Sequence, residues 1–480
     1  MRFIIAIAFS FLFTITEAQV FDAIIAKDGS GTHTSLASAI SRLRTKSSGR
    51  YRIFIKEGKY EEKIIITLDN VSLIGENASK VIISWDDYSG DSEGHSTSTS
   101  YTMLVEGDDF YAENLTIENT AGNVGQAVAL STTGQRQAFK SCNLLGFQDT
   151  YYAKSGMQYF QDCYIEGATD FIFGEATAVF ENCQINCVKG GQYITAPADT
   201  KLITQVDGSD FYHGLLFLSC DITADEDVPD NSYFLGRPWQ PNSSSVYVEC
   251  SLGNHIKPVG WSDWSNDNHL SAVFAEYKNT DSNGILIDIS NRVSWSSQVT
   301  DALSEYYKNL DYFLNSWDPK VAFVKPDVPS TITVNTDLDN NAEITWSEMQ
   351  DVAGYSIVVN DIMKWFADTN VYTDTSAVDA NTYRIASISE YGVFSDLSES
   401  ATFGAAKEIL NLPEFKDYTI RNHQIIFTEK MSVRVHTIQG KMILDQQNTD
   451  VISLNSLAPG IYVISIVDHQ GQLNSLKIAI

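Results

Sequence analysis

An aromatic residue followed three positions later by a cysteine recurs through the middle of this 480-residue chain. Five of the six cysteines obey this rule, and the shortest interval between successive copies is about 20 residues. A repeat of that length with variable insertions favours a parallel β-helix over a propeller, whose blades have a fixed period. The copies occupy residues 139–142, 160–163, 180–183, 217–220 and 247–250.

The residues around each copy favour strands. A short run of alternating apolar residues follows each cysteine, and Tyr111-Ala-Glu-Asn114 fits the same frame with Asn in place of Cys. The chain is also rich in aromatic residues, with 23 Tyr and 24 Phe, which suit a pleated surface. We therefore expect an all-β protein whose equivalent residues on successive turns stack about 4.8 Å apart.

The cysteines are predicted to stack on one another in the interior of the β-helix. Their regular place after an aromatic residue predicts stacking of small buried side chains, so few or no disulfides are expected. A bond between Cys183 and Cys187 remains possible. No CxxC pair or paired histidine accompanies them, so the sequence predicts no metal site and no cofactor.

The N-terminus predicts export. Arg2 precedes an apolar run over residues 3–13, and Thr16-Glu17-Ala18 offers a cleavage site before Gln19, so residues 1–18 read as a signal peptide. A membrane anchor would need about 20 apolar residues, and no later stretch is long enough to span a bilayer. The protein is expected to be secreted or held at the cell surface.

The charge balance excludes one class of partner. With 32 Lys+Arg against 61 Asp+Glu, the net charge is −29. A nucleic-acid binder that neutralises phosphates needs the opposite sign, so no nucleic-acid partner is expected. The chain is expected to act as a monomer.

The composition divides the chain into three parts. Residues 19–320 form the expected β-helix, with a short capping helix within 33–44 and an amphipathic stretch at 299–314 that packs along it or caps its far end. Two prolines within 325–329 predict a linker. Two small β-sandwich modules are expected to follow, at residues 330–404 and 405–480.

Each small module resembles a known one. Residues 330–404, with Trp346 early and Tyr383 late, resemble a fibronectin type III domain. Residues 405–480 resemble the C-terminal sorting domain of the type IX secretion system, through Gly440-Lys441, the run Gly460-Ile461-Tyr462 and the Lys-Ile near the end. That resemblance implies the type IX secretion machinery as a partner and transit through the periplasm. An ordinary accessory β-module is the alternative.

One motif matches a serine hydrolase signature but lacks the surrounding pattern that the signature requires. The segment 90–94 matches the G-x-S-x-G of serine hydrolases, and His95 follows it. That motif needs a strand before the serine and a helix after it. Neither pattern is present, because the segment lies in a stretch rich in Ser, Thr and Gly, so we interpret it as a loop.

Two acids hold the same position on neighbouring turns. Asp149 lies seven residues after Cys142, and Asp170 lies seven residues after Cys163. Two carboxylates in register are costly unless one is protonated or a cation compensates, and such pairs serve acid/base chemistry. A solvated turn residue is the usual reading of one aspartate, but two in register favour a catalytic site.

Amide and cationic groups accompany these acids. Gln126 and Gln148 lie one turn back from Gln148 and Asp170, each at an offset of 22 residues, and their amide N–H groups suit an oxyanion hole. Arg237 offers a guanidinium to keep one carboxylate ionised, and Trp239 offers an indole to stack on a sugar.

These motifs together resemble the pectin methylesterase family, whose members are right-handed parallel β-helix enzymes. The resemblance covers about residues 22–318, in the family's order. It rests on QAVAL at 126–130, GFQDTYY at 146–152, DFIFG at 170–174 and LGRPW at 235–239, with GKYEE at 58–62 and GQYITA at 191–196.

The resemblance implies a role for each residue. Asp170 is the nucleophile that attacks the methyl-ester carbonyl of galacturonate, and Asp149 is the acid that protonates departing methanol and then the base that activates water. Gln126 and Gln148 stabilise the oxyanion. Arg237 holds Asp170 and lowers its pKa, while the neighbouring charge raises the pKa of Asp149.

The resemblance also implies the substrate. Trp239, Phe171 and Tyr152 line a groove for methyl-esterified pectin, and no metal is needed. A pectate lyase or polygalacturonase is one rival, but the first needs a calcium-binding carboxylate cluster and the second a different spacing of acids. A non-catalytic pectin-binding adhesin is the other, and methanol release separates it from an esterase.

Overall fold

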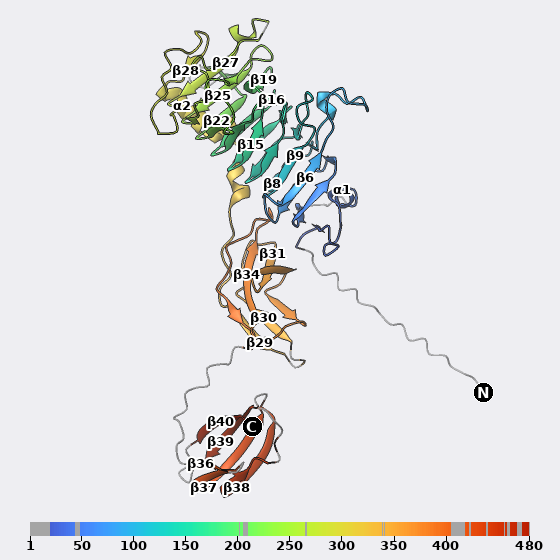
Figure 1. The fold of residues 1–480 in the computed structure, drawn as a ribbon, viewed down its shortest axis with the longest axis vertical. Helices are drawn as coiled ribbons and strands as arrows, with labels where there is room; N and C mark the ends of the chain where they lie inside the picture. Colours follow the sequence, from blue (N-terminus) through green and yellow to red (C-terminus); the bar gives the residue numbers. More distant parts are fainter. Residues whose placement is uncertain are drawn as a thin grey trace, which may run out of the picture. The chain divides into compact units, whose positions relative to one another are not determined.

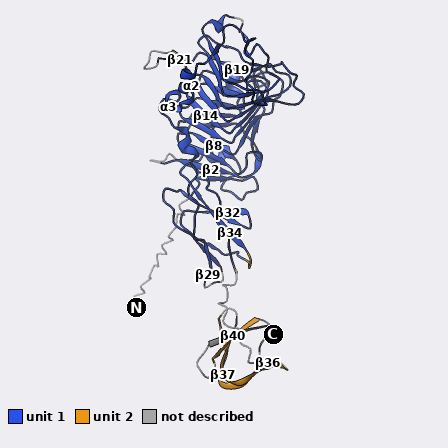
Figure 2. Ribbon diagram, turned by 90° about the vertical axis from the view of Figure 1, so that its left-hand side faces the viewer, with its two compact units in different colours: residues 1–377, 381–403 blue, residues 378–380, 404–480 orange. Residues whose placement is uncertain are grey.

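The computed structural model describes most of the chain. The described residues are 20–43, 49–200, 202–204, 210–264, 266–337, 339, 341–404, 418–421, 424–437, 440–455, 457, 461–467 and 473–479. The expected signal peptide lies outside these residues. They form two compact units, one of residues 1–377 and 381–403 and one of residues 378–380 and 404–480 (Figure 2).

The first unit is built on a right-handed parallel β-helix, as predicted, in which successive turns add strands to three sheets (Figure 1). The first sheet contains β1 (Ala23–Ile25), β2 (Tyr51–Ile55), β5 (Val71–Gly75), β8 (Tyr111–Glu113), β11 (Gln137–Lys140), β14 (Met157–Gln161), β17 (Thr177–Glu181), β22 (Leu215–Leu218), β25 (Ser244–Val248), β27 (Val273–Tyr277) and β28 (Ser297–Gln298).

The second sheet contains β3 (Gly58–Glu61), β6 (Val81–Trp85), β9 (Thr116–Asn119), β12 (Asn143–Leu145), β15 (Tyr164–Gly167), β18 (Gln184–Cys187), β23 (Asp221–Ala224) and β26 (Ser251–Leu252). The third contains β4 (Ile64–Ile66), β7 (Met103–Val105), β10 (Leu130–Thr132), β13 (Tyr151–Ala153), β16 (Thr169–Gly174), β19 (Tyr193–Pro197) and β24 (Phe234–Gly236). A hairpin of β20 (Leu202–Thr204) and β21 (Asp210–Tyr212) projects between turns.

The predicted ladders fill the β-helix core. The aromatic residues of the repeat stack with ring centroids 4.4–5.0 Å apart, through Phe139, Phe160, Phe180, Phe217 and Tyr247. All six cysteines are buried and free, so Cys183 and Cys187 are not bonded. Stacked rings and thiols therefore hold successive turns together without cross-links.

The repeat frame proposed for Tyr111 is wrong by one residue. Phe139 pairs with Ala112, which places Leu115, and not Asn114, in register with Cys142. The residue before each of the five repeat cysteines, and before Leu115, has the left-handed conformation that turns the chain from the first sheet into the second. Short polar side chains tolerate this conformation best, and most of these positions carry one: Asn114, Ser141, Asp162, Asn182, Ser219 and Glu249, with φ of 49–58°.

Helices accompany the β-helix at both ends. At the N-terminal end, α1 (Leu36–Ile40) is shorter than the predicted helix and packs Leu36 into the core. At the C-terminal end, α2 (Asp301–Lys308) and α3 (Leu310–Phe313) pack along the outer face of the first sheet. Single 3-10 turns are η1 (Thr97–Thr99), η2 (Asn268–Leu270) and η3 (Pro319–Phe323).

The second module is a two-layer β-sandwich. One sheet contains β29 (Thr333–Thr336), β30 (Ala342–Thr345) and β33 (Val371–Asp374), and the other contains β31 (Gly354–Val359), β32 (Ile362–Ala367), β34 (Thr382–Ile388) and β35 (Ala401–Thr402). Trp346 and Tyr383 lie buried in its core. The architecture agrees with the predicted sandwich, while its likeness to fibronectin type III stays a prediction.

This sandwich packs directly against the β-helix, although the prolines at 325–329 predicted a linker. Phe21 lies 4.8 Å from Phe366 between ring centroids, and Phe54 lies 5.8 Å from Phe394. These aromatic residues belong to one apolar cluster that joins the two modules into a single unit.

The second unit is a small antiparallel β-structure. Its described strands are β36 (Tyr418–Arg421), β37 (Gln424–Thr437), β38 (Met442–Ser453), β39 (Ile461–Val467) and β40 (Leu473–Ala479). They form one hydrogen-bonded sheet with register shifts along β37 and β38, where two separate sheets were expected. In the described part of the chain, the helices are too short and too polar to cross a membrane.

Candidate active site

Asp149 and Asp170 lie side by side on neighbouring turns of the third sheet, as their spacing predicted. Gln148 pairs with Thr169 on one side of them, and Tyr151 pairs with Ile172 on the other. The backbone N–H of Asp149 donates to the carbonyl of Thr169 at 3.1 Å. Only 7% of each aspartate is exposed, so both carboxyl groups are held in a largely dry environment.

Both aspartates adopt the left-handed backbone conformation, with φ of 65° at Asp149 and 49° at Asp170. The pairing of β16 with β19 slips between Thr169 and Ile172, as expected of a bulge. A bulge changes which side chains face outward, and this one directs Asp170 to the surface of the sheet.

The bulge also makes the prediction for Phe171 wrong. The Phe171 side chain is fully buried in the β-helix core and does not line the groove. Gly167 leaves room for it, since a Cβ there would lie 2.2 Å from Cβ of Phe171. After the bulge the alternation resumes one residue late, so Phe173 lines the groove in its place.

Arg237 approaches Asp170 from the loop after β24. Its Nε donates to Oδ1 of Asp170 at 2.9 Å, and its Nη2 donates to Oδ2 at 2.5 Å. This two-point geometry fixes the orientation of the carboxylate as well as its charge.

The environment separates the two acids. Burial raises the pKa of Asp149 well above its usual range, the charge of Asp170 raises it further, and a hydrogen bond from Gln148 and the charge of Arg237 oppose the rise. Burial also raises the pKa of Asp170, but the hydrogen bond and charge of Arg237 limit that rise. The family resemblance implied a lowered pKa for Asp170, and this net lowering is absent. Asp149 nevertheless remains the acid that keeps its proton to higher pH.

A cleft of about 380 Å³ contains both carboxyl groups. The predicted residues Gln126, Gln148, Tyr152 and Trp239 line it, and Tyr152 stacks on Phe173 with ring centroids 4.3 Å apart. Sequence reasoning missed several other lining residues, which come from loops without a repeat: Ser89, Ser96, Thr97, Ser98 and Trp264.

The two glutamines lie just before strands of the third sheet, Gln126 before β10 and Gln148 before β13. Gln126 is in register with Gln148, as predicted, but Gln148 is in register with Thr169 and not with Asp170. Both amides nevertheless line the cleft beside the carboxyl pair. Gln148 also hydrogen-bonds Asp149, so the second N–H of its amide and those of Gln126 are the candidate donors to an oxyanion.

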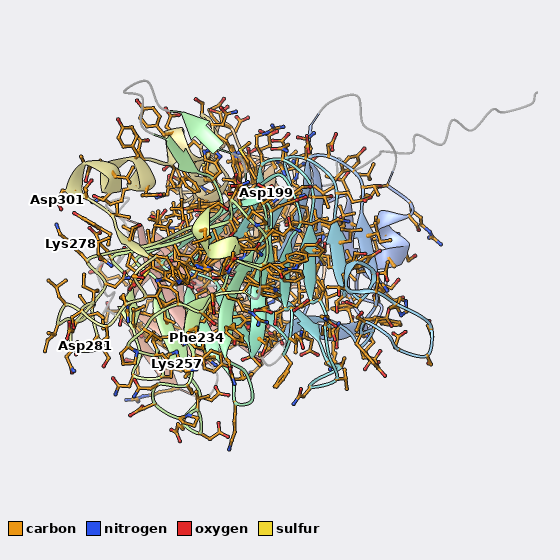
Figure 3. The ribbon with its side chains drawn as sticks, turned by 90° about the horizontal axis from the view of Figure 1, so that it is seen from above. Asp199, Phe234, Lys257, Lys278, Asp281 and Asp301 are labelled. Atoms are coloured by element: carbon orange, nitrogen blue, oxygen red, sulfur yellow. The ribbon has the colours of Figure 1, made fainter. Side chains whose placement is uncertain are left out.

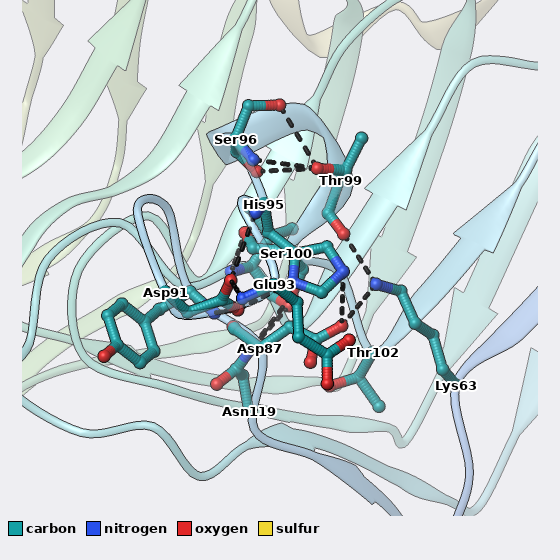
Figure 4. A network of polar contacts seen from close by, with 12 residues as sticks. Lys63, Asp87, Asp91, Glu93, His95, Ser96, Thr99, Ser100, Thr102 and Asn119 are labelled. Atoms are coloured by element: carbon teal, nitrogen blue, oxygen red, sulfur yellow. Dashed lines mark hydrogen bonds and ion pairs between the residues drawn. The ribbon is translucent and has the colours of Figure 1, made fainter.

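A polar network supports the loop that carries Ser96–Ser98 (Figure 4). Asp91 accepts hydrogen bonds from the backbone N–H groups of Glu93 at 3.0 Å and His95 at 3.1 Å. His95 places Nδ1 2.6 Å from Asp91 and Nε2 3.3 Å from Asp87, which also binds the Lys63 ammonium. This is a supported loop without the strand and helix of a nucleophile elbow, as expected.

Comparison with known proteins decides the family. A family model described as Pectinesterase matches residues 22–312. The chain belongs to the pectinesterase family. Among curated relatives in this family, Pectinesterase 2 of Citrus sinensis is 38% identical over 280 residues, covering 57% of this chain and 53% of the relative. A probable pectinesterase/pectinesterase inhibitor of Brassica napus is 34% identical over 291 residues, covering 58% of this chain and 48% of the relative.

The chain thus spans about half the length of these curated pectinesterases. Solved structures match the β-helix more completely. Pectin methylesterase from carrot aligns with a TM-score of 0.56 and 30% identity, over 62% of this chain and 93% of that chain. Pectin methylesterase PemA from Erwinia chrysanthemi aligns with a TM-score of 0.53 and 30% identity, over 63% and 99%. The predicted resemblance to pectin methylesterases is confirmed.

A second family model covers the end of the chain. Residues 418–480 match the secretion system C-terminal sorting domain. This confirms the resemblance of the last module to a type IX sorting domain. The chain therefore joins a pectinesterase β-helix to a sorting domain within one polypeptide.

Proposed function

We propose that this protein hydrolyses the galacturonate methyl esters of pectin to pectate and methanol. The observation that carries the proposal is the pairing of two buried carboxyl groups of which one, Asp170, is bound at both oxygens by Arg237. Such a site provides a nucleophilic carboxylate beside a proton donor, which is what hydrolysis of an ester through a covalent intermediate requires.

In the first half of the reaction, a carboxylate oxygen of Asp170 attacks the ester carbonyl carbon. The carbonyl oxygen becomes an oxyanion, which the amide N–H groups of Gln126 and Gln148 stabilise by hydrogen bonds. When the intermediate collapses, Asp149 gives its proton to the methoxy oxygen, and methanol leaves. The product is an anhydride between Asp170 and the galacturonate.

In the second half, water replaces methanol. Asp149, now a carboxylate, takes a proton from a water molecule as its oxygen attacks the galacturonyl carbonyl carbon. The bond to Asp170 breaks, and both catalytic groups return to their first protonation states. Each step uses side chains of this chain, so the proposed reaction needs no cofactor.

The cleft suits a chain of uronic acid residues. Tyr152, Phe173 and Trp239 present aromatic surface next to the acids, and the apolar faces of sugar rings stack on such surfaces. The serines and threonine of the loop at 96–98 add hydroxyl groups to the lining of the cleft. We assign methyl-esterified homogalacturonan as the substrate class.

The match to a sorting domain supports a location outside the cell for this reaction. We infer that the signal peptide directs the chain to the periplasm and that the type IX machinery then delivers it to the surface or the medium. A monomer suffices there, since one chain supplies every group of the proposed mechanism.

Methanol release from highly methylated pectin tests the function. The purified protein is expected to release methanol and to lower the pH of a weakly buffered pectin solution, and pectin de-esterified beforehand with alkali is the control that should give neither. Unsaturated uronide products would indicate a lyase, and new reducing ends a glycosidase. Binding to pectin without methanol release would indicate an adhesin and refute the proposal.

A further inference from the structure

The guanidinium of Arg237 lies over two aromatic rings at the same time as it binds Asp170. Its Cζ is 3.9 Å from the ring centroid of Tyr193 and 4.0 Å from that of Trp264. Both distances are short for a cation on an aromatic face. The flat faces of the guanidinium therefore contact rings, while its edge carries the two hydrogen bonds to Asp170.

The Tyr193 ring is itself held in place. Tyr193 begins β19 and is the cross-strand partner of Phe234 in β24, and the two rings stack at 5.3 Å with an interplanar angle of 10°. Nζ of Lys257 lies 3.8 Å from the Phe234 centroid on the same surface (Figure 3). Tyr193 is thus part of a stacked column that runs from Lys257 through Phe234 to Arg237, which also contacts Trp264.

The two rings differ in their relation to the cleft. Trp264 lines it and is within reach of a bound substrate, whereas Tyr193 is not among the lining residues. An effect of Tyr193 on the reaction must therefore pass through Arg237.

We propose that Tyr193 is a positioning residue that holds the Arg237 guanidinium in the plane in which it binds both oxygens of Asp170. This inference rests on the proposed esterase function for its consequence in turnover. It concerns a residue on a strand that the mechanism does not otherwise use.

The physical reason is the freedom of an arginine side chain. Arg237 reaches Asp170 from the loop after β24, and 23% of its side chain is exposed, so its head group has alternatives in water. A ring against one face removes many of these alternatives and leaves the in-plane donors pointing at the carboxylate. Without the ring, Arg237 spends less time on Asp170, and burial then favours protonation of the nucleophile.

Three substitutions of Tyr193 distinguish the effect of an aromatic ring from the effect of side-chain volume. Tyr193→Phe keeps the aromatic face, Tyr193→Leu keeps apolar bulk without it, and Tyr193→Ala removes both. We expect the Phe variant to match the wild type. The Leu and Ala variants should lose about 10-fold in kcat/KM below neutral pH, the factor that corresponds to a cation–π contact of ordinary strength. In the pH profile of kcat/KM, the fall in activity on the acid side should move to higher pH in these two variants.

A second readout does not depend on turnover. The titration of the Asp170 carboxyl carbon, followed by NMR in protein with ¹³C-labelled aspartate and assigned with Asp170→Asn, should move to higher pH in Tyr193→Leu but not in Tyr193→Phe. An unchanged Asp170 titration in Tyr193→Leu would overturn the inference. Absence of methanol release by the wild type would refute the proposed function alone, because the titration still reports on the arginine.

Discussion

Asp149 and Asp170 occupy equivalent positions on neighbouring turns and share the left-handed backbone conformation, but only Asp170 binds an arginine at both oxygens. The asymmetry comes from the next turns of the β-helix, since Arg237 follows β24, two strands beyond β16 in the third sheet. A pair that the repeat makes alike thereby has two different environments, in which the pKa of Asp149 is raised well above its usual range and Arg237 limits the rise at Asp170.

Replacing the nucleophile should abolish turnover without unfolding the protein. Asp170→Asn keeps the shape of the side chain but removes the carboxylate that attacks, so methanol release should fall on the order of 10⁴-fold, as when a member of a catalytic triad is removed. Asp162→Asn is a matched control, because Asp162 is another left-handed aspartate of the β-helix but is exposed and lies outside the cleft. Turnover near that of the wild type in Asp170→Asn would refute the assignment.

The pH profile of kcat/KM should have two limbs of known origin. Asp170 attacks as a carboxylate, so activity falls as the pH drops through its pKa. Asp149 must hold a proton for the leaving group, so activity falls as the pH rises through its pKa, which burial and the charge of Asp170 raise. Arg237→Gln should move the acid limb to higher pH, because Arg237 opposes protonation of Asp170. An acid limb unmoved by that substitution would contradict these roles.

The raised pKa of Asp149 also predicts a cost in stability. A carboxyl group whose pKa is higher in the folded state stabilises the fold while protonated, and this contribution is lost as the pH rises through the folded pKa. Asp149→Asn should therefore raise the melting temperature above that of the wild type in alkaline buffer, with a smaller gain in acid. Thermal unfolding at both pH values checks this, and an equal gain at both would show that ionisation is not the cause.

The sequence predicts that the two acids lie together because both are at a fixed distance from a cysteine of the repeat. Counting from Cys142 and Cys163 works as long as each turn has the same number of residues up to the acid. The place in the groove that the family resemblance implied for Phe171 is wrong, since a bulge at Asp170 reverses the direction of the next side chain. No pattern of residue types marks such a bulge in advance.

The sequence also does not predict the contacts between distant segments. Tyr193 and Trp264 meet Arg237 from two other segments, separated from it by loops of irregular length, so no period links the three. In the same way, Phe21 and Phe366 pack together although most of the sequence of the first unit separates them. The prolines between the modules show where the chain leaves the β-helix, but not that the sandwich returns to its surface.

One amide should matter for the rate and another only for the fold. Gln126→Ala removes a donor to the oxyanion, so kcat should fall by about 10²–10³ with little change in KM. Gln137 is a useful control because its buried Nε2 donates to the carbonyls of Val105 and Gly107 inside the β-helix, away from the cleft. Gln137→Ala should lower the melting temperature and leave kcat of the folded enzyme unchanged. A Gln126→Ala enzyme with normal kcat would exclude its role.

The two C-terminal modules should respond differently to deletion. The sorting domain belongs to a separate compact unit, so a chain that ends at Gly404 should keep the melting temperature and specific activity of the β-helix. A chain that ends at Pro329 also lacks the sandwich, which exposes Phe21 and Phe54 where Phe366 and Phe394 covered them. Burial of apolar surface contributes about 25 cal/mol per Å², so this shorter chain should melt at a lower temperature or aggregate.

Delivery from the periplasm to the surface or the medium should depend on the sorting domain. In a host with a type IX secretion system, the chain that ends at Gly404 should stay in the periplasm as a folded, active esterase, because it lacks the residues that match the sorting domain. Cell fractionation with a methanol assay on each fraction measures this, and the full-length chain is the control that should appear at the surface or in the medium. Surface delivery of the truncated chain would show that residues 405–480 are not the export signal, while loss of its activity would show that they support the catalytic unit.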